Sequence, residues 1–385
     1  MIGRMGSAAS NRPLSVLIAG GGVAAIEASL ALQAIAEERV EVTLLAPSAE
    51  FHYRPLAVTE PFPIAAHLTL PLDAIAADAS ARLRMGALDR VDVDRREAWT
   101  SSGERLTYDA LLVATGARAA DSVPGAVTFW AGPGGGAFAM LLEELQAGAV
   151  RRPVFAVPSG VTWPLPLYEL ALLTAHQLDL RGVDADVTLV TPESRPLALF
   201  GGEASDAVAR LLRERGIHFL AETHPVAVVD GDLSVAPGGS IRADAVVTLP
   251  VLTGPAYGGL PHDKRGFLPT NPSCVVDDVP AVFAAGDATS FPIKQGGIAA
   301  QQAEIAAQEI ALLAGAGVRR KPFRPVLRGR LLTGGEPLFL RAELHGGGGD
   351  TSTASTEPLW WPPAKIFGRY LGPYLAERVG ALTNS

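Results

Sequence analysis

Cysteine is the scarcest residue of this chain, because Cys274 is the only one among 385 residues. A single cysteine excludes a disulfide within the chain, a cysteine-based metal cluster and a redox centre made of two thiols. We also predict no metal site. Cys274 lies in the segment NPSCVVDDVPAVFAAGD, and we interpret it as a buried packing residue rather than a nucleophile.

Basic clusters and long apolar runs are also missing. The chain has 32 Lys and Arg against 40 Asp and Glu, and no run of five or more basic residues, which argues against a nucleic-acid partner. No apolar run reaches the roughly 18 residues of a membrane-spanning helix. The N-terminal segment MIGRMGSAASNRP lacks the apolar core of a signal peptide, so we expect a cytoplasmic protein.

Glycine and proline are plentiful, at 41 and 30 residues, and 48% of the chain is hydrophobic. This composition is typical of a packed globular protein with many turns. Because 385 residues exceed one ordinary core, we predict two or three domains.

A phosphate-binding turn is predicted near the N-terminus, between an apolar strand at Leu14 to Ala19 and a helix. In a G-x-G-x-x-A turn, the first glycine permits a tight bend and the second lets a pyrophosphate approach the backbone. The small third residue lets helix and strand pack closely, and the helix N-terminus offers free N–H groups. The residues expected at this turn are Gly20, Gly21, Gly22, Val23, Ala24 and Ala25.

The acid that commonly follows the second strand of such a unit is missing. That strand, VEVTLLAP, ends at Ala46-Pro47 instead of at Asp or Glu. Either Glu50 holds the adenosine ribose, or the backbone and water hold it.

Two later strand ends point to a flavin. TYDALLVATGARA ends in Ala114-Thr115-Gly116, and VFAAGDAT ends in Gly286-Asp287. An Asp at a strand end can accept a hydrogen bond from a ribityl hydroxyl, and the next helix can direct its N-terminus at the pyrimidine edge, where charge develops on reduction. The alternative role for Asp287 is a helix N-cap.

Three segments narrow the match to a family. FHYRPLAV resembles the H-x-F-x-P-L segment of type II NADH dehydrogenases, PIKQGG resembles the P-x-K-[TS]-G segment of sulfide:quinone oxidoreductases, and AAQQAEIAAQ is similar to the A-Q-x-A-x-Q pattern of the NADH dehydrogenases. With the glycine turn and the two strand ends, the chain resembles two-dinucleotide-domain flavoproteins of the pyridine-nucleotide-disulfide oxidoreductase superfamily. Its nearest branch is that of the sulfide:quinone oxidoreductases and type II NADH dehydrogenases.

The resemblance implies non-covalent FAD bound near the predicted turn and strand ends. Leu88 would offer its backbone to the adenine, and Arg54 would neutralise the pyrophosphate, unless it is only a surface ion-pair residue. Lys294 would place a positive charge beside the pyrimidine or the ring edge, unless it is a solvated loop lysine. The further expected cofactor contacts are Ala114, Thr115, Gly116, Gly286, Asp287, Gln295 and Gly297.

A second unit with the same alternation of strands and helices follows at Arg152 to Leu220. Its phosphate turn is altered, because the segment VFAVPSGVTWPLPLYEL carries prolines, which supply no N–H, and Trp163, which would crowd a dinucleotide. These residues argue against a fingerprint-type NAD(P)H site, although Glu193 leaves an acid available for a nucleotide ribose. In sulfide:quinone oxidoreductases the corresponding turn carries a redox cysteine to the flavin. The resemblance places Trp163 near that cysteine, facing the flavin, and so argues against a persulfide mechanism.

The predicted fold is α/β, with two Rossmann-like domains and a small C-terminal α+β part. The discontinuous FAD domain covers 12–122 and 255–320, the second Rossmann-like domain covers 123–254, and the C-terminal part covers 321–385. We predict a linker at Ala131 to Gly136. In the C-terminal part we predict a hairpin around Gly334-Gly335, a flexible loop at His345 to Glu357, and an amphipathic element at 358–380.

That last element suggests peripheral membrane contact, with packing across the flavin pocket or a homodimer contact as the alternatives. The leading functional hypothesis is an FAD-dependent oxidoreductase that passes electrons from an unidentified small-molecule donor through flavin to a quinone or another small acceptor. One alternative is an NAD(P)H-dependent ferredoxin or quinone reductase with an atypical turn. Another is a catalytically silent flavin-binding scaffold.

Overall fold

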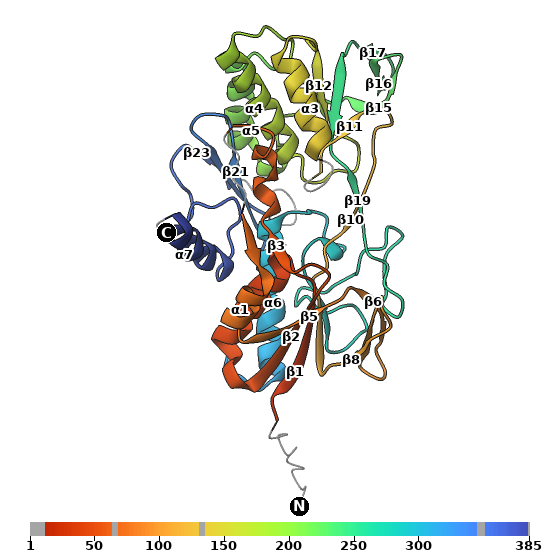
Figure 1. The fold of residues 1–385 in the computed structure, drawn as a ribbon, viewed down its shortest axis with the longest axis vertical. Helices are drawn as coiled ribbons and strands as arrows, with labels where there is room; N and C mark the ends of the chain where they lie inside the picture. The colour runs from red at the N-terminus through yellow and green to blue at the C-terminus, as the bar shows by residue number, and fades with distance from the viewer. Residues whose placement is uncertain (1–11, 64–67, 131–134, 345–350, 384–385) are drawn as a thin grey trace, which may run out of the picture.

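The computed structural model describes residues 12–63, 68–130, 135–344 and 351–383. Two parallel sheets occupy the two ends of an elongated molecule, and the C-terminal part lies beside their junction (Figure 1). Within these residues, none of the helices has the length and apolar character needed to cross a bilayer.

The first sheet has the strand order β20–β9–β1–β2–β5, and every neighbouring pair is parallel. The central strands β1, β9 and β20 are almost entirely apolar, as expected for a parallel sheet whose two faces are both covered. Along β1, Val16 and Ile18 face the core formed with helices α1 and α6, whereas Leu17 and Ala19 face the core formed with strands β6 and β7. The five strands are β1 (Leu14–Ala19), β2 (Val40–Ala46), β5 (Ala81–Met85), β9 (Ala110–Val113) and β20 (Val282–Ala284).

Helices α1 and α6 lie side by side on one face of this sheet, although 259 residues separate their ends in the chain (Figure 1). The other face is covered by the antiparallel meander β6–β7–β8. The helices are α1 (Val23–Ala36), α2 (Leu72–Asp78) and α6 (Gly296–Leu313), with short 3-10 turns at η1 (Glu37–Arg39), η2 (Arg54–Thr59) and η4 (Gly286–Ala288). The remaining strands are β3 (Glu50–His52), β4 (Thr69–Pro71), β6 (Leu88–Asp92), β7 (Glu97–Thr100) and β8 (Arg105–Thr107).

The second sheet, β11–β18–β12–β13–β14, is also parallel throughout. Helix α4 is apolar along most of its length and is buried against β12, β13 and helix α3. It ends at Arg181, followed by Gly182 in the left-handed conformation that favours glycine. The strands are β11 (Val127–Thr128), β12 (Pro153–Ala156), β13 (Thr188–Val190), β14 (His218–Leu220) and β18 (Ala245–Thr248). The other elements are α3 (Gly135–Gln146), α4 (Leu165–Arg181), α5 (Gly202–Glu214), η3 (Ala198–Phe200), β15 (His224–Val229), β16 (Asp232–Ala236) and β17 (Ser240–Ile241).

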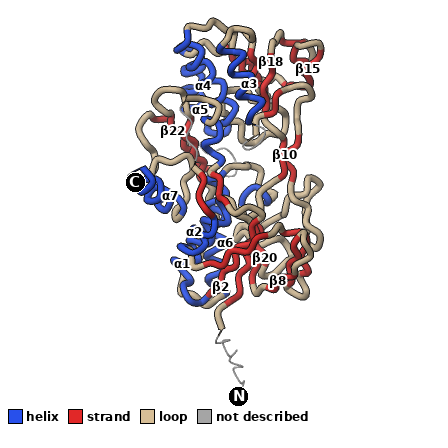
Figure 2. Tube along the Cα trace, viewed as in Figure 1, coloured by secondary structure: helices blue, strands red, loops and turns tan. Residues whose placement is uncertain are grey.

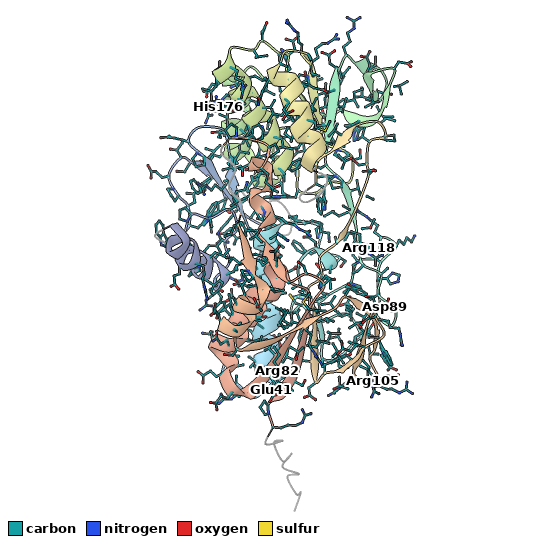
Figure 3. The ribbon with its side chains drawn as sticks, viewed as in Figure 1. Glu41, Arg82, Asp89, Arg105, Arg118 and His176 are labelled. Carbon is teal, nitrogen blue, oxygen red and sulfur yellow. The ribbon has the colours of Figure 1, made fainter. Side chains whose placement is uncertain are left out.

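The two halves are joined by an antiparallel pair of strands, β10 (Arg118–Ala120) and β19 (Val251–Thr253) (Figure 2). The chain thus leaves the first half through β10 and returns to it through β19. The outer edge of the first sheet is polar, where Arg82 on β5 and Glu41 on β2 form an exposed ion pair of 3.3 Å (Figure 3).

The C-terminal part consists of the antiparallel sheet β21–β22–β23 and helix α7 (Leu371–Thr383). Glu27, buried on α1, accepts hydrogen bonds from the backbone N–H groups of Tyr370 (3.1 Å) and Leu371 (2.7 Å). This carboxylate satisfies amides at the start of α7 and ties that helix to α1. The strands are β21 (Val326–Leu331), β22 (Leu338–Glu343) and β23 (Ser352–Ser355).

Three local predictions are wrong or incomplete. The linker predicted at 131–136 ends earlier, because Gly135 begins α3; residues 131–134 lie outside the described part of the chain. The loop predicted at 345–357 contains β23, which pairs with β22; residues 345–350 are outside the described residues. Within 358–380, the helix begins only at Leu371, so that Pro373 falls in its first turn, where a missing N–H costs nothing. The hairpin around Gly334-Gly335 is present as β21 and β22.

Candidate functional site

A cavity of about 560 Å³ extends between the two sheets. Its wall comes from the turn after β1, the turn after β12, strand β21 and the residues just before α7. The ends of β9 and β20 also contribute, because the carboxyl ends of parallel strands meet at one edge of a sheet.

The turn after β1 has the geometry that a pyrophosphate requires. Gly20 has φ +132°, and a Cβ added there would lie 2.2 Å from the carbonyl oxygen of Ala114, so only glycine fits. A Cβ added at Gly22 would meet nothing within 4 Å, which leaves open space above the start of α1. No side chain caps α1, so its first N–H groups are available to an anion. These residues fit the phosphate end of FAD.

Most of the predicted cofactor residues lie on the wall of this cavity. Ala25 and Gly297 are not on this wall, and their predicted role as cofactor contacts stays a prediction. Ala25 lies in the first turn of α1 and is fully buried, as the small packing residue of the motif. The Gln295 side chain lies about 3 Å from where a Cβ at Gly297 would be. The predicted residues on the wall are Gly20, Gly21, Gly22, Val23, Ala24, Arg54, Leu88, Ala114, Thr115, Gly116, Trp163, Gly286, Asp287, Lys294 and Gln295.

Asp287 and Lys294 bring opposite charges to the middle of the cavity. Asp287 lies in η4, eight residues before Gln295, which is the actual N-cap of α6, so the N-cap alternative for Asp287 is wrong. Burial raises the pKa of Asp287, while Lys294 and Arg54 oppose that rise. Burial lowers the pKa of Lys294 to about 8, and its ammonium lies 3.7 Å from the centroid of the Phe267 ring.

The start of α6 is partly occupied by its own side chain. Gln295 accepts a hydrogen bond from the backbone N–H of Ile298 at 2.8 Å and donates to the carbonyl oxygen of Arg328 at 3.2 Å. The helix end therefore offers fewer free amides than the sequence suggested, and Gly296 and Ala299 are its residues on the cavity wall.

The turn after β12 lines the same cavity, through Gly160 to Trp163 and then Leu165 and Pro166 of α4. The Trp163 ring packs at 5.6 Å from the Phe200 ring. The neighbouring acid, Glu193, is not on the wall: one oxygen accepts from the Tyr168 hydroxyl at 2.7 Å and the other from the backbone N–H of Ala198 at 3.0 Å. Glu193 is therefore engaged within the protein and does not face a nucleotide ribose.

The remaining candidates divide between the cavity and the core. Glu50 lines the cavity, beyond the end of β2, as one of the two predicted ribose options requires. Cys274 is buried among apolar residues of the first core and is not on the cavity wall. Burial raises the pKa of its thiol to about 12, which makes it a poor nucleophile.

Sequence reasoning missed four charged residues of the cavity: Glu169 on α4, Arg265 in the loop after β19, Arg330 on β21 and Lys365 before α7. Glu169 did carry a signal, since it is the only acidic residue in the apolar run LPLYELALLTA. Lys365 and Arg330 carried none, because their positions depend on how the C-terminal sheet packs against the second domain.

The segment 358–380 closes one side of the cavity. Ile366 is on its wall, and Leu371 and Leu375 are buried in the core that contains α1. The sequence left three roles open for this segment: membrane contact, a homodimer contact, or packing across the flavin pocket. The contacts that the segment makes within the chain agree with packing across the pocket. Trp361 remains 80% exposed.

Together, two parallel α/β sheets and a glycine turn that opens into a shared cavity define the class of two-domain dinucleotide-binding reductases. A family model described as pyridine nucleotide-disulphide oxidoreductase matches residues 14–307. The chain belongs to this family.

Known proteins similar to the chain lie within the same group. The sulfide-quinone reductase of Aquifex aeolicus is 24% identical over 304 residues, covering 72% of this chain and 69% of that protein. The crystal structure of the sulfide:quinone oxidoreductase from Aquifex aeolicus superimposes with a TM-score of 0.79 at 21% identity, covering 86% of this chain and 84% of that one. A ferredoxin reductase from Rhodopseudomonas palustris gives 0.65 at 18% identity, covering 85% and 81%.

These similarities confirm the predicted fold class and superfamily. They also confirm the coarser functional prediction, a flavoprotein oxidoreductase that uses FAD. The boundaries at 122, 254 and 320, and the role of each site residue, stay predictions.

Proposed function

We propose that this chain is an FAD-dependent oxidoreductase that takes electrons from a small donor and passes them to a quinone or another small acceptor. The observation that carries the proposal is the continuity of one cavity. Its wall includes the glycine turn after β1, the charged pair Asp287 and Lys294, and the aromatic residues Phe129, Trp130 and Trp163. A cofactor held at the glycine turn would present its reactive ring to a flat substrate held by the aromatic residues.

In this proposal, bound FAD supplies the electron-transfer chemistry, and the protein supplies position and charge. Gly20 and Gly22 leave room for the pyrophosphate at the start of α1. The Asp287 carboxylate accepts a hydrogen bond from a cofactor hydroxyl, and Lys294 stabilises negative charge that develops nearby.

The turn after β12 argues against oxidation of sulfide through a cysteine persulfide. Trp163 lies in this turn, and Cys274 is buried in the core away from the cavity. It also disfavours a tight NAD(P)H site, because the turn contains prolines and Glu193 is engaged with Tyr168 and Ala198. A small hydrogen or electron donor that enters the open cavity directly remains the best-supported class.

The test is anaerobic stopped-flow measurement of flavin absorbance after mixing with NADH, NADPH, sulfide and reduced quinone. Rapid bleaching by reduced quinone or another small donor, with reoxidation by quinone, supports the proposal. Rapid bleaching by NADH or NADPH instead assigns the chain to the NAD(P)H-dependent alternative. Flavin that no donor reduces indicates the silent scaffold, and protein that neither carries nor takes up FAD refutes all three.

The site assignment has its own test in the affinity for FAD. Asp287→Ala removes the carboxylate on the cavity wall and should weaken FAD binding by about tenfold, as expected for the loss of one hydrogen bond to a charged group. Asp277→Ala, in an exposed loop away from the cavity, is the matched control and should leave the affinity unchanged. Equal affinities for the two variants would contradict the assignment.

Contact with a membrane or with a second copy of the chain is proposed through Trp361, the exposed aromatic of the segment 358–380. Co-sedimentation with lipid vesicles and the oligomeric state of the protein distinguish the two partners. Trp361→Ser should abolish whichever contact is found. If it changes neither measurement, the segment serves only to close the cavity.

A further inference from the structure

Arg265 is a cation of the cavity wall that has no acidic partner. It lies in the loop after β19, the strand by which the chain returns to the first half. Its Nη2 donates to the carbonyl oxygen of Leu252 at 2.8 Å, and its guanidinium carbon lies 5.4 Å from the centroid of the Phe267 ring. The guanidinium forms no ion pair and no second hydrogen bond with the described residues. Its remaining N–H groups are therefore available to a molecule in the cavity.

The loop holds this arginine in a fixed place. Oδ1 of Asp263 accepts hydrogen bonds from the backbone N–H groups of Arg265 at 2.8 Å and Phe267 at 2.9 Å. The carbonyl oxygen of Arg265 accepts from the backbone N–H of Gly254 at 2.8 Å. A Cβ added at Gly254 would lie 2.1 Å from the backbone of Gly266, so the two arms of the loop are in direct contact. A side chain on such a loop is positioned before any ligand arrives.

A second cation, Lys294, faces the same phenylalanine ring, with its ammonium 3.7 Å from the ring centroid. Burial is the main cause of the lowered pKa of Lys294, and the positive charge of Arg265 lowers that pKa further. Asp287 and Asp263 oppose the shift. Asp263 is not on the cavity wall, and Asp287 also faces Arg54. Asp287 is thus the acid of the wall that compensates Arg54 and Lys294, and Arg265 is left over.

The other two acids of the wall have partners elsewhere. Glu169 forms a buried ion pair with Lys365, and Oε2 of Glu50 lies 3.6 Å from Nε2 of His52. The chain as a whole has a net charge of −8, so the surplus of positive charge in this part of the cavity is local. The phosphate end of FAD fits the turn after β1, which leaves Arg265 for another anion.

We infer that Arg265 binds the carboxylate of the electron donor, and that the donor is a flat organic acid. This assignment rests on the proposed function and names the chemical class of its donor. A guanidinium offers parallel N–H donors that match the two oxygens of a carboxylate. The indole rings of Trp130 and Trp163, which are also on the wall, suit a flat molecule. The electron transfer itself stays with the bound cofactor.

The test uses benzoate and benzamide, which share a flat ring and differ in one charge. Ligand-observed NMR titrations of the oxidised, FAD-loaded protein give the two dissociation constants. We expect benzoate to bind at least about tenfold more tightly, as one hydrogen bond between charged groups provides. This preference should shrink in high salt, because Arg265 is exposed. Equal affinities, or binding of neither probe, would overturn the inference.

Variants assign the preference to Arg265. Arg265→Gln should weaken the binding of benzoate about tenfold and leave that of benzamide unchanged. Arg265→Lys keeps the charge but not the planar fork, and it should give an intermediate affinity for benzoate. The matched control is Arg118→Gln, because Arg118 is an exposed arginine on β10, the strand paired with β19, and is not on the cavity wall (Figure 3). This control should bind both probes as the wild type does. A benzoate preference that survives in Arg265→Gln contradicts the assignment.

Two further measurements separate this assignment from its alternatives. Arg265→Gln should unfold at the wild-type temperature and bind FAD with the wild-type affinity. If it loses affinity for FAD and keeps the benzoate preference, Arg265 serves the cofactor and the inference is wrong. Wild-type protein that prefers benzoate through Arg265, but that no donor reduces, keeps the anion site and refutes the proposed function. Protein that small neutral donors reduce, and that shows no preference for benzoate, keeps the proposed function and refutes the inference.

Discussion

The two outer glycines of the turn after β1 should respond very differently to the same added methyl group. At Gly20, a Cβ would lie 2.2 Å from the carbonyl oxygen of Ala114, whereas ordinary contact begins at 3.4 Å. At Gly22, the nearest atom is more than 4 Å away and φ is −98°, which alanine adopts without strain. We therefore predict that Gly20→Ala damages the fold and that Gly22→Ala damages only the binding of FAD.

The magnitude at Gly20 has two parts. Overpacking of a rigid site costs about 1–3 kcal/mol, and a non-glycine residue at φ +132° costs about 1–3 kcal/mol more. A total of about 4 kcal/mol lowers the thermal midpoint of a large domain by roughly 8–16 °C. At Gly22, loss of a glycine N-cap costs less than about 1 kcal/mol, but the methyl group occupies the approach of the pyrophosphate.

The assay is thermal unfolding of both variants without FAD, followed by fluorescence titration with FAD. Gly20→Ala should unfold at a much lower temperature than the wild type. Gly22→Ala should unfold near the wild-type temperature and bind FAD at least about tenfold more weakly, which corresponds to about 1.4 kcal/mol. Equal unfolding temperatures for the two variants would refute the geometry at Gly20, and unchanged FAD affinity in Gly22→Ala would refute the proposed phosphate site.

Three further outcomes follow from buried ionisable groups. Burial lowers the pKa of Lys294 to about 8, so between about pH 8 and pH 10.5 the unfolded chain binds more protons than the folded protein. The free energy of unfolding, measured by urea denaturation, should therefore rise across this pH window. The rise should be larger in the wild type than in Lys294→Met. Glu27→Ala removes the acceptor for the backbone N–H groups of Tyr370 and Leu371, so the hydrogen exchange of these two amides should accelerate about tenfold. The acceleration should be smaller in Glu27→Gln, which keeps an oxygen acceptor. Cys274, whose thiol pKa is raised to about 12, should resist iodoacetamide in the folded protein and react only in urea.

Local patterns in the sequence predicted the parts of the fold that depend on neighbouring residues. The strand at Leu14–Ala19 and the uncapped helix after it follow from an apolar run and a glycine turn, and both are present. Helix α3 was missed because its first residues, Gly135 and Gly136, are poor helix formers that suggest a loop. Strand β23 was missed because STAS has little apolar character and forms a strand only by pairing with β22.

The candidate site shows the same division. Asp287 and Lys294 were found because each belongs to a short segment with a recognisable spacing. The pair of Glu169 and Lys365 joins residues 196 positions apart, and no local pattern links them. At Glu193 a local pattern misled the prediction. Its place at a strand end suggested an acid that is available to a nucleotide ribose, but in the fold its carboxylate accepts a hydrogen bond from the Tyr168 hydroxyl.

The discontinuous first sheet has a consequence for synthesis on the ribosome. The second sheet is complete once Thr248 has left the ribosome. At that point the first sheet still lacks its strand β20 (Val282–Ala284), and helix α1 still lacks its packing partner, helix α6 (Gly296–Leu313). The middle of the chain can therefore fold before its beginning. Until α6 is made, the apolar side of α1 is exposed to water. This interval is when the nascent protein most needs a chaperone.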